Sequence, residues 1–313
     1  MKEEGTNFSP GKLKKSDFMK NIEFLIIAAP GIVLLFLFNY LPMFGIIISF
    51  KDFNPNKGIW GSKWNGVENF KYFFTSPDAV RIIRNTVLYS LDFMFLTLIC
   101  AVILALMFYA LTNQKILKTY NTIVILPKFL SMVLIAYIVY AFLNPVSGLM
   151  NRILNIFGIG SIDWYSKPGA WPFILTIVHI WQVVGMQSII YYASLMSIDE
   201  SLFEAAELDG ASKFQQIMNI SIPHLIPIMT IQTILAFGSI FSGDFGLFYQ
   251  VTRDVGTLYP TTDIINTYVF RGLKSGNMSV SAAIGFVQSI LGLIMVVAAN
   301  KLVQKISPEN SLF

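Results

Sequence analysis

The sequence predicts an all-α, polytopic membrane protein with six transmembrane helices. Hydrophobic residues make up 55% of the 313 residues and charged residues only 13%, whereas soluble domains carry roughly a quarter charged residues. The apolar residues are gathered in six runs, each near or above the roughly 20 residues that cross the hydrocarbon as a helix. Because open sheet edges are not stable in lipid, these runs are expected to be helical.

The six predicted spans are separated by linkers rich in Asn, Pro and Gly. The first span is too long for a signal-peptide core, so we expect it to be retained. Together the spans form a single transmembrane domain over 22–313, preceded by a lysine-rich tail at 1–21. The spans lie at about 24–50, 87–111, 123–143, 171–195, 225–245 and 282–302.

Six spans place both chain ends on the same side of the membrane. The positive-inside rule does not identify that side, because basic residues are divided almost equally between the two sets of loops. The net charge of +4 does not indicate nucleic-acid binding, since the basic residues flank apolar runs and form no long stripe.

The sequence also argues against metal and nucleotide sites in this chain. His179 and His224 are far apart and have no Cys or His at metal-site spacing. A single cysteine, Cys100, allows no internal disulfide. Gly5 to Lys12 departs from the P-loop pattern in spacing, and Leu13 stands where Ser or Thr is required.

The loop at 197–223 is acidic but also carries apolar side chains. Ser201 and Glu204 have the spacing of a helix-starting capping box. Gly210 is expected to end that helix in a left-handed turn, and Ser212 to cap a second helix that leads to Pro223. Such a helix either packs against the protein's own helix ends or docks on a separate subunit with basic residues.

The fixed letters of this loop resemble the EAA loop of ABC importer permeases. The matching string is Glu204-Ala205-Ala206, Asp209-Gly210 and Ile220-Ser221-Ile222-Pro223. The one departure is Ile222, where the family usually has Leu. The resemblance covers almost the whole chain, including Asn85-Thr86 and Trp181. It is closest to the maltose-type sugar permeases, and within these to Gram-positive oligosaccharide permeases associated with lipoprotein or aldouronate transport.

The resemblance implies a type I ABC importer fold and a function in sugar or oligosaccharide uptake. It implies a heterodimer with a second, homologous permease, a cytoplasmic ABC ATPase dimer and an extracellular substrate-binding lipoprotein. The ATPase would bind ATP and Mg, so this chain would need no cofactor and would not be an enzyme. The expected location is the bacterial plasma membrane, surrounded by lipid, with both termini cytoplasmic. The residues implied in ATPase coupling are Glu204, Ala205, Ala206, Asp209 and Gly210.

The resemblance also places the sugar path beside the fourth and fifth spans. Counting from Leu225 puts Asp244 near the outer face, whereas the family places this segment near mid-membrane. Aromatic faces, amides and carboxylates are suited to sugar rings and hydroxyls. The implied substrate residues are Gln182, Val183, Met186, Phe241, Gly243 and Asp244.

Structural roles are alternatives for the polar and aromatic residues of the spans. For Trp181 and Phe241 the alternative is a core or lipid-facing aromatic, and for His179 it is a packed bundle residue. Lys128 is expected either to pair with Asp92 or to extend to the interface. Small residues at four-residue spacing in the last span permit close helix packing; these are Ser281, Gly285 and Ser289.

Three other functions are alternatives to sugar import by an ABC system. An ion-coupled secondary transporter would rely on Asp92 and Asp244, and would leave the loop at 197–223 unexplained. An ABC importer for a non-sugar solute fits the loop equally well. An intramembrane enzyme would need a catalytic constellation, which the spans lack.

Overall fold

The computed structural model describes residues 22–306, and it confirms the all-α prediction. The only strands in the described part are β1 (Lys51–Asp52) and β2 (Lys63–Trp64), which pair antiparallel. The chain divides into two compact units at Ile47–Ile48. The predicted tail at 1–21 lies outside the described residues.

The first unit is a helical rod that begins with α2 (Ile22–Leu35). It continues as a π-helical turn, η1 (Phe36–Tyr40), and a 3-10 stretch, η2 (Leu41–Phe50), which crosses into the second unit. Most side chains of the rod are exposed although nearly all are apolar. Such a surface is unfavourable in water and suits a helix surrounded by lipid.

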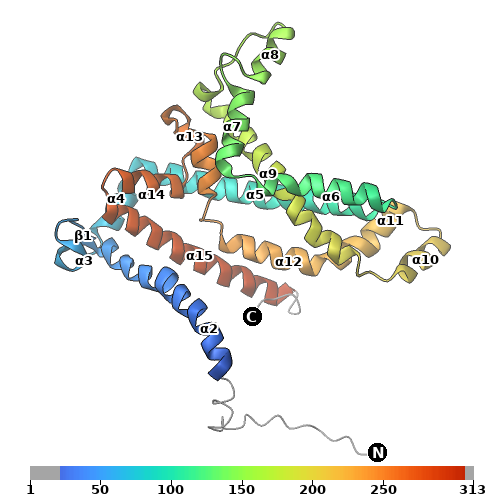
Figure 1. Cartoon of the computed structure of the whole chain (residues 1–313), viewed down its shortest axis with the longest axis horizontal. Helices are drawn as coiled ribbons and strands as arrows, with labels where there is room; N and C mark the ends of the chain where they lie inside the picture. The colour runs from blue at the N-terminus through green and yellow to red at the C-terminus, as the bar shows by residue number, and fades with distance from the viewer. Residues whose placement is uncertain (1–21, 307–313) are drawn as a thin grey trace, which may run out of the picture. The chain divides into compact units, whose positions relative to one another are not determined.

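Long helices lie alongside one another in the second unit (Figure 1). α5 (Pro77–Tyr109) packs on α9 (Trp171–Leu195), and α6 (Gln114–Phe129) packs on the other side of α9. α12 (Ile222–Gly238) packs on α15 (Met278–Ile306). Five helical runs are long and apolar enough to span a membrane, and a bent helix pair brings the number to six.

Short elements connect these helices in the described part of the second unit. On the loops they are α3 (Gly58–Gly61), α4 (Glu68–Thr75), α8 (Leu149–Ile156), η3 (Trp164–Ser166), η4 (Pro168–Ala170), α10 (Glu200–Leu208), α11 (Lys213–Gln216) and η5 (Ile217–Ser221). Towards the end of the chain they are η6 (Leu247–Val251), η7 (Gly256–Leu258), α13 (Tyr259–Thr262) and α14 (Ile265–Lys274).

The prediction of one uninterrupted span over 123–143 needs correction. α6 ends at Phe129, and α7 (Met132–Leu143) departs from it at an angle of 99°. The side chain of Ser131 accepts a hydrogen bond from the Leu134 backbone N–H (3.3 Å) and so starts α7 as a new helix. Pro127, near the end of α6, further weakens helical continuity at the break.

The second predicted span also differs in its boundaries. α5 begins at Pro77 rather than near Val87, because Ser76 caps it and Pro77 occupies its first turn. Arg81 and Arg84 therefore lie on the helix itself. This places two cations at the end of α5 that meets α13 and α14.

Three apolar clusters hold the described part of the second unit together, and the third joins α4, α5, α14 and α15 around Ile82 and Ile284. The first joins α5, α7, α9 and η6 around fully buried side chains such as Trp171, Leu175 and Phe248. The second joins α5, α9 and α12 around Ala105, Leu195 and Leu225. Polar side chains lie between these clusters.

The small residues of the last span permit close packing within this chain or against a partner permease, and within this chain they differ. Ser281 is buried, and its Oγ would lie 2.3 Å from a Cβ on Gly272, so α15 packs closely on α14 there. Gly285 faces open space and Ser289 is exposed. Within the described chain, only Ser281 of the three therefore makes a close helix contact.

Candidate functional site

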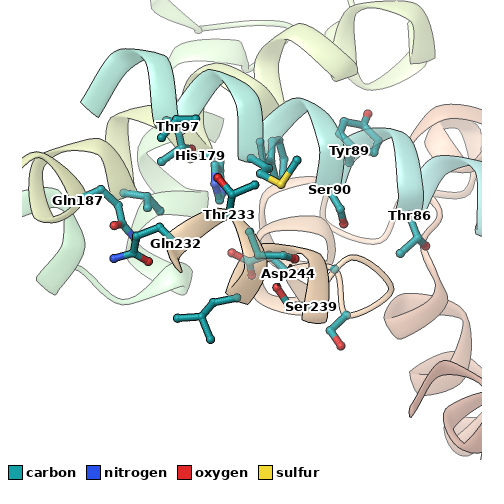
Figure 2. A pocket seen from close by; sticks show the side chains of 18 of the residues that line it. Thr86, Tyr89, Ser90, Thr97, His179, Gln187, Gln232, Thr233, Ser239 and Asp244 are labelled. Carbon is teal, nitrogen blue, oxygen red and sulfur yellow. Dashed lines mark hydrogen bonds between the residues drawn. The ribbon is translucent and has the colours of Figure 1, made fainter. Parts of the chain in front are cut away.

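A cavity of ≈ 390 Å³ lies between α5, α9, α12 and the segment that follows α12. Figure 2 shows polar side chains of α5 on one side and those of α12 and the following turn on the other. Its polar lining is Thr86, Tyr89, Ser90, Thr97, His179, Gln187, Tyr191, Gln232, Thr233, Ser239, Ser242 and Asp244. Hydroxyls and amides, which both donate and accept hydrogen bonds, dominate this lining.

A break in the fifth span creates one wall of the cavity. The predicted span over 225–245 is corrected here, because α12 ends at Gly238 and the chain turns through 239–244 before helix resumes. The Asp244 carboxylate starts the new helix by accepting a hydrogen bond from the Leu247 N–H (Oδ1–N, 3.0 Å). Non-helical backbone at membrane depth is tolerated where it lines protein or a polar cavity.

Glycine is required where this turn meets the loop before α14. A Cβ on Gly243 would lie 2.7 Å from Ile264 Cδ1, which is closer than real side chains approach. Ile264 is itself fully buried and lines the same cavity. The contact fixes the turn, and with it Asp244, against the core.

Three buried polar atoms of the cavity wall have no hydrogen-bond partner within the described part of the chain. They are Tyr89 Oη, Thr97 Oγ1 and His179 Nδ1. The His179 ring stacks on Phe93 with ring centres 3.9 Å apart, which holds it at the wall. Because these atoms are themselves buried, the polar surface that a guest can reach comes from the hydroxyls and amides of the other lining residues.

The structure brings together three of the six predicted substrate residues. Val183, Gly243 and Asp244 line the cavity. Gln182 is buried in the bundle without lining it, and Met186 is 45% exposed elsewhere. On α9 the cavity face repeats every four residues (His179, Val183, Gln187 and Tyr191), and positions one residue earlier point about 100° away.

Phe241 and Trp181 have the core or lipid-facing positions that were the alternative to lining the sugar path. Phe241 packs against an apolar cluster that includes Ile82 and Ile284 and does not line the cavity. Trp181 is 43% exposed. These aromatics therefore serve packing or the lipid-facing surface in this chain.

Most of the cavity's polar residues were missed by sequence reasoning, although they carried a signal. Thr86, Ser90 and Thr97 recur on one face of the apolar α5. Gln232 and Thr233 occupy the middle of α12. Polar side chains within an apolar run are functional candidates, and helical spacing would have placed the α5 residues on a common face.

The other intramembrane carboxylate faces a different groove. Thr176 Oγ1 donates to Asp92 Oδ2 (2.5 Å), and both residues line a groove on another face of α5 and α9. This bond replaces the expected pairing of Asp92 with Lys128, which is exposed on α6. Asp92 therefore does not contribute to the polar cavity.

The acidic loop forms α10, and its starting residue needs correction. Asp199, rather than Ser201, is the N-cap, since its Oδ1 accepts from the Ser201 N–H (3.0 Å). That hydrogen bond also lowers the pKa of the Asp199 carboxyl. The expected capping box of Ser201 and Glu204 therefore does not form, because α10 begins two residues earlier with Asp199 as its cap.

One face of α10 packs against the rest of the chain, and the other face is exposed. Phe203 packs against Tyr109 at the end of α5, with ring centres 5.8 Å apart. Leu202 and Leu208 are 53% and 90% exposed. Among the resemblance residues, Glu204, Ala205, Asp209 and Gly210 are exposed and Ala206 is half-buried. The interpretation that the helix packs against the protein's own helix ends is confirmed for one face, and docking of the exposed face on a separate subunit stays a prediction.

The turn after α10 follows the prediction. Gly210 has φ +78°, a left-handed conformation that favours glycine. Ser212 caps α11, and with Gln215 it forms a reciprocal capping box. Across the turn Lys213 forms an ion pair with Glu207, which lowers the pKa of the Glu207 carboxyl through a hydrogen bond and charge attraction.

Comparisons with known proteins identify the family. Residues 97–308 match the binding-protein-dependent transport system inner membrane component family. Protein LplB of Bacillus subtilis (strain 168) is 31% identical over 91% of this chain and 89% of its own length. The polygalacturonan/rhamnogalacturonan transport system permease protein YteP of the same organism is 31% identical over 90% of this chain and 87% of its own.

The same fold occurs in a crystal structure of a bacterial ABC transporter that imports the acidic polysaccharide alginate. The matching chain has a TM-score of 0.85 and 29% identity, covering 93% of this chain and 98% of that one. A second structure, of the alginate transporter with a pentasaccharide-bound periplasmic protein, matches with a TM-score of 0.84 and 29% identity, covering 93% and 97%. The chain belongs to the family of binding-protein-dependent transport system inner membrane components, and it is a multi-pass ABC importer permease, a transport subunit rather than an enzyme.

Proposed function

We propose that this permease imports an oligosaccharide and that the cavity between α5, α9 and α12 is its half of the sugar path. The observation that carries this proposal is the lining of hydroxyls and amides that α5, α9 and α12 present to one cavity, among them Ser90, Gln187 and Gln232. Sugar hydroxyls both donate and accept, so they complement such a wall. The relative YteP, which is named as a polygalacturonan/rhamnogalacturonan transport permease, supports the same substrate class.

The second half of the path is proposed to come from a different, homologous permease. The cavity is not fully enclosed by α5, α9, α12 and the turn that follows α12. A sugar held in an open half-site would remain largely hydrated, whereas ligand pockets bury most of a ligand's surface. A substrate-binding lipoprotein outside the membrane would deliver the oligosaccharide.

Coupling to a cytoplasmic ATPase dimer is proposed to run through α10 and the turn at Gly210. The exposed Leu202 and Leu208 give this helix an apolar surface to dock, and its acidic side chains suit a basic groove. Phe203 and the Glu207–Lys213 pair tie the docking helix to the permease. ATP and Mg would be bound by the ATPase, and closure of its dimer would move α10 as a rigid lever.

Docking of α10 on the ATPase requires both chain ends to be cytoplasmic, in a bacterial plasma membrane. Cysteine labelling in a Cys100→Ser background tests this topology. An impermeant reagent applied outside should modify Lys57→Cys, which is exposed beside α3, and should spare Lys213→Cys until the membrane is opened. The reverse pattern would contradict the orientation.

The function is tested with the reconstituted complex of both permeases, ATPase and binding protein. We expect ATP-dependent uptake of an oligosaccharide, and hydrolysis stimulated by the sugar-loaded binding protein. Uptake driven by an ion gradient without ATP would instead indicate a secondary transporter. An active complex built from two copies of this chain alone would contradict the heterodimer.

A further inference from the structure

A second pocket, of ≈ 230 Å³, lies between α7 and η6 together with the turn that follows η6. Its lining combines aromatic rings with an amide and a guanidinium, and within the described part of the chain it includes no acidic side chain. The aromatic and polar members are Tyr137, Tyr140, Tyr249, Gln250 and Arg253. This aromatic pocket has room for a single sugar ring rather than for a whole oligosaccharide.

The aromatic pocket and the polar cavity share η6. Phe248 lines the polar cavity, and the next two residues, Tyr249 and Gln250, line the aromatic pocket on another face of the same short helix. α7 leads into the loop before α9, and η6 into the loop before α14. By the proposed topology both loops lie outside, so the aromatic pocket is on the side from which an oligosaccharide is delivered.

The guanidinium of Arg253 is available to a guest. It lies over the Tyr140 ring, 4.2 Å from the ring centre. The ion pairs among the described residues do not include Arg253, and its side chain makes no hydrogen bond to them. The neighbouring carboxylate, Asp254, is paired with Arg271 instead (2.8 Å). The N–H groups of Arg253 can therefore serve a ligand.

An unusual backbone conformation holds Arg253 in this position. Arg253 and Asp254 have φ angles of 58° and 51°, and among the described residues they are the only non-glycine residues with positive φ. Such conformations are unfavourable, persist where surrounding contacts impose them, and gather at functional sites. Here they place one side chain over Tyr140 and the next against Arg271. The turn thus gives the pocket a cation and keeps the adjoining anion out of it.

A second cation adjoins the aromatic pocket. Lys274 donates a hydrogen bond to Tyr249 Oη (2.9 Å) and lies 4.8 Å from the centre of the Phe270 ring. The carboxylate of Asp244, at the other end of this segment, lines the polar cavity and not the aromatic pocket. Positive charge therefore dominates the field that a guest in the aromatic pocket meets.

We propose that the aromatic pocket binds a uronate unit of an acidic oligosaccharide, with Arg253 as the residue that holds its carboxylate. The proposal rests on the proposed function of this permease in oligosaccharide import. A guanidinium pairs with a carboxylate through two parallel hydrogen bonds. Tyr137, whose side chain is 67% exposed, offers a ring face to the sugar, and the Gln250 amide can pair with its hydroxyls.

A lipid phosphate is the competing anion, because Arg and Tyr also anchor proteins at membrane surfaces. The pocket favours the sugar, since a concave lining of several rings and an amide matches a flat, hydroxyl-bearing ring better than a mobile headgroup. The test therefore measures sugar and lipid separately.

The experiment uses the complete complex of both permeases and the ATPase in lipid nanodiscs, without the binding protein, so that the binding protein's own selectivity does not enter the result. The probes are a galacturonate trisaccharide and its carboxyl-reduced, neutral form with the same linkages. Equilibrium retention of each is quantified by mass spectrometry. Phospholipid that stays bound to the same complex in detergent is counted by native mass spectrometry.

We expect the wild-type complex to retain the uronate about tenfold better than the neutral form. Arg253→Gln removes the charge and the forked donor, and should bring the two forms to within about twofold while leaving retention of the neutral form unchanged. Arg253→Asn is a second variant should the first fail to assemble, because Asn tolerates the left-handed backbone. Arg152→Gln removes an exposed cation of α8 that does not line the pocket, and should keep the wild-type preference.

Each outcome decides between the inferences. Equal retention of both forms by the wild-type complex, or a preference for the neutral form, would overturn the uronate site while leaving sugar import in place. A preference that persists in both Arg253 variants, or that falls equally in Arg152→Gln, would remove Arg253 as its cause. Loss of bound phospholipid from Arg253→Gln with unchanged uronate retention would assign the pocket to a lipid headgroup. Retention of neither form by an intact complex would overturn both the uronate site and the sugar path.

Discussion

Gly185 on α9 lies so close to Val124 on α6 that a Cβ at Gly185 would be 2.0 Å from the Val124 carbonyl oxygen. The two helices thus meet backbone to backbone, as small residues allow in membrane bundles. Gly185 is two residues from Val183 and from Gln187, which both line the cavity. The contact therefore sets the position of the α9 cavity face.

Gly185→Ala should destabilise the protein by about 1–3 kcal/mol, because backbone atoms cannot yield to an added methyl as a flexible side chain can. The measurement is thermal unfolding of the purified complex. Gly285→Ala is the matched control on α15, where a Cβ has open space within this chain. Equal melting temperatures for Gly185→Ala and wild type would show that α6 and α9 adjust freely.

The left-handed turn at Gly210 predicts a graded series of uptake defects. Asn adopts this left-handed backbone conformation readily. For Ala the conformation is unfavourable by about 1 kcal/mol or more, and for a β-branched residue it is the most unfavourable. We expect sugar uptake to fall in the order Gly, Asn, Ala, Val, with equal amounts of chain in the membrane. If Gly210→Asn failed as completely as Gly210→Val, side-chain volume at the docking surface would matter rather than backbone conformation.

Asp263 should be essential to the loop structure that joins α5 to α14. Its side chain is fully buried and accepts from Arg81 (3.0 Å), Arg271 and Thr267 Oγ1 (2.9 Å). Asp263→Ala would remove the buried acceptor of two guanidinium groups and of the Thr267 hydroxyl. Because Arg81 keeps Asp78 and Arg271 keeps Asp254 as partners, we expect a loss of about 1–3 kcal/mol. Thermal unfolding of the complex measures this loss.

Asp78→Asn is the control for that experiment. Asp78 also pairs with Arg81 (2.9 Å), but its side chain is 35% exposed. Such a pair contributes at most about 1 kcal/mol. Similar losses from Asp78→Asn and Asp263→Ala would contradict a special role for the buried carboxylate.

Tyr165 predicts a loss of stability at alkaline pH. Its phenol is 8% exposed and packs against Trp171 with ring centres 5.0 Å apart. Burial raises the pKa of Tyr165 from 10.0 to about 12. Because the folded-state pKa lies above the unfolded one, the neutral phenol's contribution is complete below pH 10. That contribution is lost as the pH rises toward 12, at roughly 1.4 kcal/mol per pH unit.

Tyr165→Phe should therefore flatten the decline in melting temperature between about pH 10 and 12. The matched control is Tyr72→Phe, which removes an exposed phenol from α4. An unchanged alkaline decline in Tyr165→Phe would assign the effect to other groups.

Local sequence rules predicted the coupling loop more completely than the cavity. The Gly210 turn and the Ser212 cap depend on residues a few positions apart, so both could be read from the chain. The α10 N-cap was placed at Ser201 rather than Asp199, because several capping residues occur in succession and only the turn geometry selects one. Val183 and Gln182 were both predicted as substrate residues, but only Val183 lines the cavity. The two side chains point in different directions because successive residues of a helix are about 100° apart.

The sequence by itself determined that this is a membrane protein of about six helical spans, because the length and apolarity of each run decide its transfer into lipid. It also determined the family, through fixed letters at fixed spacing in one loop. Only the tertiary structure decided where spans break, at 130–131 and 239–244, and which side chains share the cavity. Those features also depend on contacts between segments far apart in the chain, such as Gly243 with Ile264 and Gly185 with Val124, which the local pattern of one segment does not encode.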